Sequence, residues 1–130
     1  MIINLKSGMG FIKDLSTKGQ IYLEIMPHNT ENQKKHHEKL LELYGSFEIP
    51  LVATYDCHYI EHDDDQVQEV LLAIQTNAKW DDPKRFKFPI KGLHLKSQQE
   101  MTRAFKKQGQ FSQDEINKAM ANTVEIAKQC

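Results

Sequence analysis

The sequence has few cysteines and no long hydrophobic run. Its two cysteines, Cys57 and Cys130, are too few for a disulfide-stapled secreted scaffold and favour a reducing compartment. No stretch approaches the ~20 apolar residues that a membrane-spanning helix needs. The first residues also lack the basic head and apolar segment of a signal peptide. We therefore expect a cytoplasmic protein with no membrane partner.

The sequence also lacks an excess of charge of either sign. Lys and Arg number 17 and Asp and Glu 18, which gives a net charge of −1. Domains that are held to nucleic acid by their overall charge are usually distinctly basic, so only a local contact with nucleic acid is compatible with this balance. The 130 residues fit one small globular domain with a modest core.

The first half of the chain alternates between strand and helix patterns. Residues 20–27 alternate in polarity as a strand does, and residues 51–55 form an apolar, β-branched run that is typical of a buried strand. A helix pattern with short connections lies between them. Strand, helix and strand in this order predict a βαβ unit with parallel strands. Residues 1–19 match no clear pattern.

The helix between the two strands has recognisable ends. Thr30, followed three residues later by Gln33, forms a capping box that starts the helix. Gly45 is expected to end it, because glycine is the residue that most often follows a helix C-terminus. His36 and His37 lie among lysines and glutamates, so we place both on the solvent-facing side.

Three further amphipathic helices are expected in the second half. The acidic run 63–65 precedes the first of them, and capping boxes at Ser97 and Ser112 start the other two. Residues 77–95 form a long loop between the first and the second. The apolar residues of the first helix recur at helical spacing and are expected to face the core: Val67, Val70, Leu71 and Ile74.

Asp56 and His58 lie just beyond the second strand. Side chains two residues apart on extended backbone point to the same side, and the carboxyl ends of parallel strands meet at one edge of a sheet. Glu24 and His28, on and after the first strand, are therefore candidate helpers. Carboxylate and imidazole groups suit zinc, manganese or iron, although a working site needs at least three ligands. The alternative is that the pair has no chemical role.

The loop contains a segment in which cations alternate with aromatic residues, 84–88. Lys84, Arg85 and Lys87 are candidate contacts to the phosphates of nucleic acid, and aromatic residues beside them can stack on bases. We favour the alternative, in which the aromatic side chains fix a surface loop to the body of the protein.

Several motifs occur in a fixed order along residues 20–130. They are IYLEI (21–25), PLVATYDCHY (50–59), EVLLAIQT (69–76), DPKR (82–85), LKS (95–97) with EM (100–101), and ANTVEIAKQC (121–130). In this order they resemble the later part of the PHP (polymerase and histidinol phosphatase) domain of bacterial replicative DNA polymerase III alpha subunits. The resemblance implies an α/β fold, a partial (β/α) barrel with a few parallel strands, flanking helices and a helical C-terminal end.

The resemblance also implies a function. Asp56 and His58 match the last metal-ligand pair of that family, whose other ligands and polymerase carboxylates have no counterpart here. The chain would be a fragment of a DNA-directed DNA polymerase, a nucleotidyltransferase of DNA replication, and would be inactive alone because its metal site is incomplete. Its partners would be the rest of the alpha subunit, the proofreading exonuclease, and DNA through the full enzyme. Tyr55 departs from the family, which usually has Asn before this Asp.

Two other functions remain open at this point. One is a non-enzymatic interaction module that kept the scaffold and lost the chemistry. The other is a small metal-dependent phosphoesterase that uses Glu24, His28, Asp56 and His58. An unfinished barrel would also expose strand edges, so a homo-oligomer is a further expectation.

Overall fold

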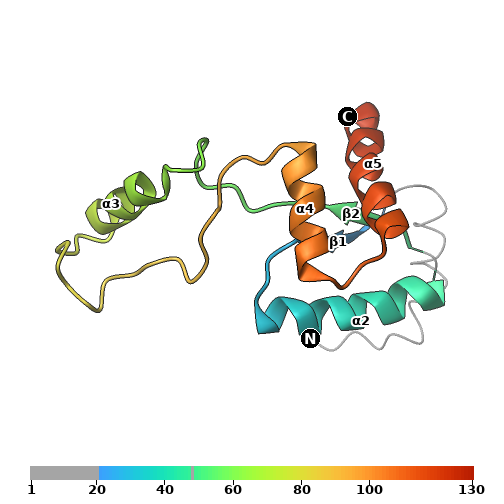
Figure 1. The fold of residues 1–130 in the computed structure, drawn as a ribbon, viewed down its shortest axis with the longest axis horizontal. Helices are drawn as coiled ribbons and strands as arrows, with labels where there is room; N and C mark the ends of the chain where they lie inside the picture. Colours follow the sequence, from blue (N-terminus) through green and yellow to red (C-terminus); the bar gives the residue numbers. More distant parts are fainter. Residues whose placement is uncertain (1–20, 48) are drawn as a thin grey trace. The chain divides into compact units, whose positions relative to one another are not determined.

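A computed structural model (Figure 1) describes residues 21–47 and 49–130 of the protein. They form two compact units. Of the described residues, those from 21 to 54 together with residues 98–130 make the first, and residues 55–97 make the second. The sequence prediction for residues 1–19 lies outside the described residues. No helix in the described ranges is both long and apolar enough to cross a membrane.

The first unit contains the predicted βαβ arrangement. Strands β1 (Leu23–Ile25) and β2 (Leu51–Ala53) are parallel, with Leu23 opposite Leu51, and helix α2 (Glu31–Phe47) connects them. Both strands are shorter than predicted. Pro27 lies two residues beyond the end of β1, and proline has no N–H to extend a ladder, whereas β2 begins directly after Pro50 as predicted and ends early, at Ala53. The described sheet has only these two strands, so the barrel that the resemblance implies stays a proposal.

Helix α2 begins as predicted and ends later. The Gln33 N–H donates to Thr30 Oγ1 at 3.2 Å, which is one half of the capping box. The Gln33 side chain does not complete the box but lies 3.0 Å from His37 Nε2. The predicted end at Gly45 is wrong, because the helix continues to Phe47. A glycine ends a helix when it adopts a positive φ, and Gly45 does not do so.

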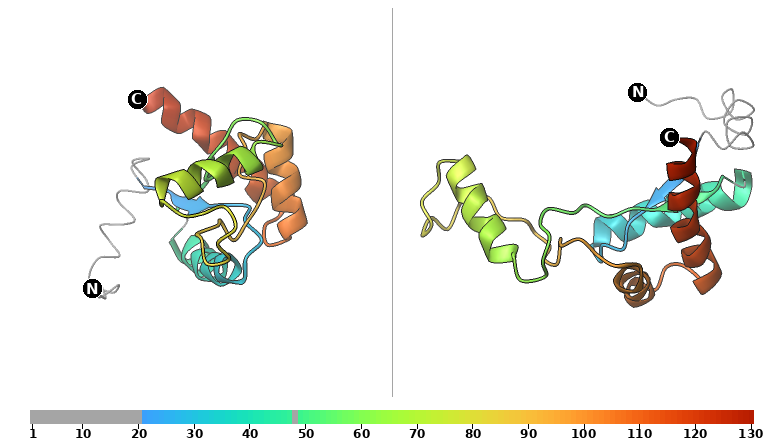
Figure 2. Two further views of the ribbon diagram at one scale, coloured as in Figure 1. Left: turned by 90° about the vertical axis from the view of Figure 1, so that its left-hand side faces the viewer. Right: turned by 90° about the horizontal axis from the view of Figure 1, so that it is seen from above.

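The core of the first unit lies between its strands and its helices. Helix α5 (Gln113–Gln129) packs against β2, helix α4 (Gln98–Gln108) packs against α5, and α2 contacts β1. The strands lie between α2 and α5 (Figure 2). The largest buried apolar side chains come from both ends of this part of the chain: Ile25, Phe105 and Ile116. The two halves therefore share one core although they are far apart in sequence.

Local signals fix the two C-terminal helices. The Ser112 capping box is fully formed, with Ser112 Oγ accepting from the Glu115 N–H and the Glu115 side chain accepting from the Ser112 N–H. Helix α4 ends at Gly109, which has a φ of 75° and donates its N–H to the Phe105 carbonyl. Asn122 Nδ2 of α5 donates to the Leu51 carbonyl at 2.7 Å and so satisfies a polar group of β2.

The second unit joins residues near 55–59 to residues near 92–96. The Tyr55 hydroxyl donates to the Gly92 carbonyl at 2.7 Å, and the Leu93 N–H donates to the Tyr59 hydroxyl at 2.8 Å. Burial raises the pKa of Tyr55 to about 12, so this hydroxyl keeps its proton and its donor role. Tyr59 also pairs with His94 in an isolated β-bridge. The predicted long loop is thus tied down at its end by two tyrosines.

Helix α3 (Asp65–Gln75) follows the acidic run as predicted, but its apolar face is not covered within its own unit. The four side chains expected to face the core are between 41% and 71% exposed: Val67, Val70, Leu71 and Ile74. The inward side instead carries Ala73, which is buried, and Glu69, which binds Arg85. The expectation that these four side chains face the core is therefore wrong within this unit.

Candidate functional site

Asp56 and His58 lie side by side in the second unit, as their spacing predicts. His58 Nε2 is 3.0 Å from Asp56 Oδ2, and the His58 ring packs on Phe88 with centroids 4.3 Å apart. This contact is an ordinary hydrogen bond between an imidazole and an exposed carboxylate, and it places the two groups on the same side of the chain.

The other two candidate ligands belong to the first unit. Glu24 is exposed on β1 and accepts a hydrogen bond from Thr54 Oγ1 at 2.7 Å. The backbone carbonyl of His28 accepts from Gln108 at 2.7 Å. Across the described residues, no group of three or more His, Cys, Asp or Glu side chains could hold a metal ion. A site made from Glu24, His28, Asp56 and His58 stays a prediction.

The cationic loop contains one residue with a clear structural role. Arg85 has a side chain that is only 3% exposed, and its guanidinium donates to Glu69 at 2.6 Å and to the Trp80 carbonyl at 3.2 Å. It also stacks over the Trp80 ring at 4.3 Å. A guanidinium held in this way is not presented to a phosphate. A nucleic-acid contact stays a prediction for Lys84 and Lys87, which are exposed.

The Arg85 contacts change the chemistry of Glu69. The hydrogen bond from Arg85 holds the pKa of this carboxyl below its usual range. Glu69 is therefore ionised over the whole physiological range, and the pair is a permanent link between α3 and the loop.

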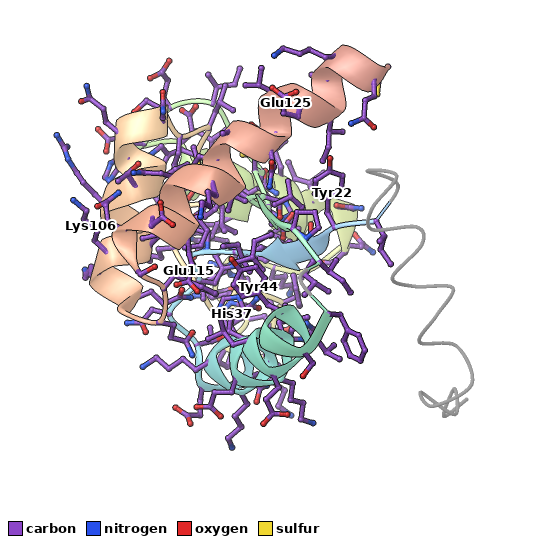
Figure 3. The ribbon with its side chains drawn as sticks, turned by 90° about the vertical axis from the view of Figure 1, so that its right-hand side faces the viewer. Tyr22, His37, Tyr44, Lys106, Glu115 and Glu125 are labelled. Atoms are coloured by element: carbon purple, nitrogen blue, oxygen red, sulfur yellow. The ribbon has the colours of Figure 1, made fainter. Side chains whose placement is uncertain are left out.

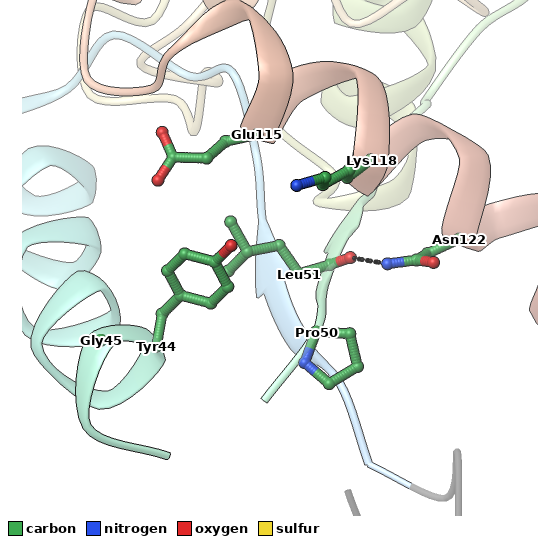
Figure 4. A pocket seen from close by; sticks show the side chains of 7 residues that line it. All are labelled: Tyr44, Gly45, Pro50, Leu51, Glu115, Lys118 and Asn122. Carbon is green, nitrogen blue, oxygen red and sulfur yellow. Dashed lines mark hydrogen bonds between the residues drawn. The ribbon is translucent and has the colours of Figure 1, made fainter. Parts of the chain in front are cut away.

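An open pocket of about 440 Å³ lies in the first unit, where α2 ends, β2 begins and α5 passes (Figure 4). No sequence pattern indicates this pocket. Three of its polar side chains are already bound within the fold. Glu115 completes the Ser112 cap, Lys118 pairs with Asp114 at 2.7 Å, and Asn122 binds Leu51. The pairing with Asp114 raises the pKa of Lys118. The pocket is therefore explained by packing, and we assign it no ligand.

His37 is a buried polar residue that the sequence analysis did not predict. The prediction that it faces solvent is wrong, because His37 (Figure 3) is completely buried. Its neighbour His36 is exposed. A signal was present, since His37 lies three and four residues before Leu40 and Leu41 and so continues the apolar stripe of α2. The lysines and glutamates around it concealed that stripe.

The hydrogen bonds of His37 define its proton position. Gln110 Nε2 donates to the Lys34 carbonyl, so Gln110 Oε1 faces His37 Nδ1, at 2.9 Å, and must accept from it. Nε2 then accepts, from the Gln33 side-chain amide at 3.0 Å. Burial lowers the pKa of His37, with the Gln110 contact opposing it. The ring is therefore a neutral link between α2 and the α4–α5 connection.

Comparison with known proteins identifies relatives of one kind. No family model matches the chain. It is 37% identical to DNA polymerase III subunit alpha of Thermus aquaticus over 119 residues, which are 91% of this chain and 9% of that one. The proteins of the same name from Mycobacterium tuberculosis and Treponema pallidum are 37% and 35% identical over 82% and 84% of this chain.

The chain therefore spans about 9% of the length of the curated relatives that it matches. The similarity covers the βαβ unit, the loop and the C-terminal helices, since it extends over most of the chain. Over most of its length, the chain is homologous to a short segment of bacterial DNA polymerase III alpha subunits.

Proposed function

We propose that the chain is a segment of the alpha subunit of a bacterial replicative DNA polymerase and acts as part of its scaffold in DNA replication. The observation that carries this proposal is the similarity over 91% of the chain to a much longer subunit. The order of the motifs supports the finer assignment to a PHP domain. In this role the chain would work in the cytoplasm with the rest of the subunit, reach DNA through the full enzyme, and offer a surface to the proofreading exonuclease.

The exposed face of α3 supports this proposal independently. Val67, Leu71 and Ile74 are each more than half exposed on one helix. A stripe of this kind is costly to leave in water, and it is expected where a segment normally packs against further polypeptide.

The size of the natural protein tests the proposal. Because 119 residues are 9% of the Thermus aquaticus subunit, that subunit is about 1,300 residues long. Antibodies raised against the purified chain should detect, in cells that carry the gene, a protein roughly ten times the mass of this 15.1 kDa chain. The immunoprecipitate should extend a primed DNA template. A single band at 15.1 kDa without primer extension would favour the interaction module instead.

The apolar face of α3 leads to a prediction about self-association. In the isolated chain this face has no cover from its own unit, so we expect concentration-dependent oligomers. Replacing Leu71 and Ile74 by Gln should reduce them several-fold, as measured by sedimentation velocity, with the free energy of unfolding unchanged to within about 0.5 kcal/mol. Val124→Gln removes an exposed apolar side chain from α5 and is the control. Equal oligomerisation in both variants would contradict the assignment of the face.

We propose that Asp56 and His58 are the metal-ligand pair that matches the PHP family. Two ligands cannot hold the metal cluster that activates water for phosphodiester hydrolysis. The purified chain should therefore show no nuclease turnover with manganese or zinc. Metal-dependent turnover that Asp56→Ala abolishes would contradict this prediction and would favour the phosphoesterase alternative.

Metal binding by the pair can be measured without activity. Zinc should shift the imidazole resonances of His58 in NMR spectra, and Asp56→Ala should weaken that shift. The control is Asp63→Asn, which alters a second exposed pair, since Asp63 lies 2.6 Å from His62. Equal responses of His58 in both variants would show that the metal binds without Asp56.

A further inference from the structure

Among the described helices, only α4 has more basic than acidic residues. Arg103, Lys106 and Lys107 outnumber its single acid, Glu100, whereas α2 has three charges of each sign. Helices α3 and α5 have more acids than bases. In a chain with a net charge of −1, this concentration on one helix is a local feature and not a consequence of composition.

The basic residues of α4 lie on a defined surface. Arg103 and Lys106, three residues apart, share the exposed face of α4 with amide and hydroxyl side chains, and together they line a shallow open hollow of about 460 Å³: Gln98, Gln99, Thr102, Arg103 and Lys106. The opposite side of the helix is anchored by buried Met101 and Phe105. Lys106 extends outward from α4 (Figure 3). We call these five residues the α4 basic face.

The cations of the α4 basic face have no acidic partners among the described residues. Elsewhere in the described chain, Lys91, Lys118 and Lys128 each form an ion pair with a carboxylate. Within the described residues, no ion pair involves Arg103 or Lys106. Glu100 does not line the hollow. An anionic ligand would therefore meet two cations without first displacing a carboxylate.

We propose that the α4 basic face binds the phosphate backbone of DNA. Arginine, lysine and glutamine side chains are among the usual protein donors to phosphate oxygens, whereas the Thr102 hydroxyl already donates to the Gln98 carbonyl at 2.9 Å. No aromatic residue lines the hollow to stack on a base, so the contact is to the backbone and independent of sequence. The choice of DNA among polyanions rests on the proposed function, whereas the choice of a phosphate backbone rests on the geometry and charge of the face.

Fluorescence anisotropy with a labelled DNA duplex and the full chain tests the proposal. Two neutralised phosphates should give a slope of about −2 in a plot of log affinity against log salt concentration. Arg103→Gln with Lys106→Gln should weaken binding at least about tenfold at low salt and flatten the slope. The control is Lys35→Gln with Lys39→Gln, which removes equal charge from exposed positions of α2 and should change affinity less than about twofold.

Three results would overturn the proposal. These are equal weakening by the two double variants, absence of salt-dependent DNA binding by the chain, and binding of phosphatidylserine vesicles at salt concentrations where DNA does not bind. Circular dichroism should show that both double variants are folded, because all four side chains are exposed. If the antibodies detect a subunit-sized band but the Arg103 and Lys106 substitutions do not change DNA affinity, only this inference is rejected. DNA binding with only a 15.1 kDa band would reject only the proposed function.

Discussion

Replacing His37 by alanine is expected to lower the free energy of unfolding of the first unit by about 3 kcal/mol. The change opens a cavity in a fully buried site and leaves the side-chain amides of Gln33 and Gln110 without their partner. It also removes the ring contact with Phe111, whose centroid is 4.9 Å from that of His37. Few other single changes in this unit would remove both packing and polar contacts.

The neighbouring histidine provides a matched control. His36→Ala removes the same side chain from an exposed position of the same helix and should change stability by less than about 0.5 kcal/mol. Far-ultraviolet circular dichroism reports mainly on α2, α4 and α5, which belong to the first unit. The unfolding temperature of this unit should fall by roughly 10–20 °C in His37→Ala and not in His36→Ala. Similar behaviour of the two variants would refute the role assigned to His37.

The same residue makes the stability of the first unit depend on pH. Burial lowers the pKa of His37 in the folded protein below its value of about 6.5 in the unfolded chain. The unfolded state therefore binds more protons between these two values, and stability falls as the pH decreases below about 6.5. We expect His37→Gln, which cannot be protonated, to have a flatter profile of unfolding temperature between about pH 7 and pH 5. An unchanged profile would contradict this mechanism.

Local signals allowed part of the fold to be predicted. The N-cap at Thr30 and the capping box at Ser112 each act over a few residues, and the structure confirms them. The apolar run at 51–55 also signals a strand locally, and the strand forms over Leu51–Ala53. The side-by-side placement of Asp56 and His58 follows from the two-residue period of extended backbone in the same way. These predictions succeeded because their physical causes lie within the stretch of sequence that signals them.

The failures have causes that lie elsewhere in the chain. His37 is buried because the α4–α5 connection supplies Gln110 and Phe111, more than 70 residues away. Glu69 on the inward side of α3 is paired with Arg85, which lies beyond the helix in the loop. No local pattern contains such partners. The four candidate metal ligands are divided between the two units, so no local pattern relates them and that site stays a prediction.

Replacing Arg85 by methionine is expected to remove the cooperative folding of the second unit. The change leaves the Glu69 carboxylate without its donor and takes the stacked cation away from Trp80. Trp80 is the only tryptophan, so its fluorescence reports on the second unit alone. We expect its emission to move toward that of a solvated indole, and amide exchange at the end of α3 to accelerate at least about tenfold.

Two further variants separate the ion pair from the packing around it. Lys84→Met removes a positive charge from the adjacent exposed position and should leave the fluorescence unchanged. Adding Glu69→Leu to Arg85→Met should restore part of the protection, since losing both partners costs less than stranding one. A double variant as unstable as the single one would show that the charge of Glu69 is not the cause.

The pH dependence of the second unit gives an independent test of the same pair. Arg85 lowers the pKa of Glu69 in the folded state, so the stabilisation is fully present above the unfolded value of about 4.3 and is lost as the pH falls below it. The Trp80 fluorescence of the wild-type chain should therefore change on acidification below about pH 4.3. In Arg85→Met this dependence should become weaker, because the carboxyl group loses its hydrogen bond to Arg85 and keeps only the smaller pKa-lowering effects of Lys87 and Lys91. A pH dependence that is weaker in Arg85→Met would show that the charge pair stabilises the unit. An equal pH dependence in both proteins would show that Arg85 acts only by packing on Trp80.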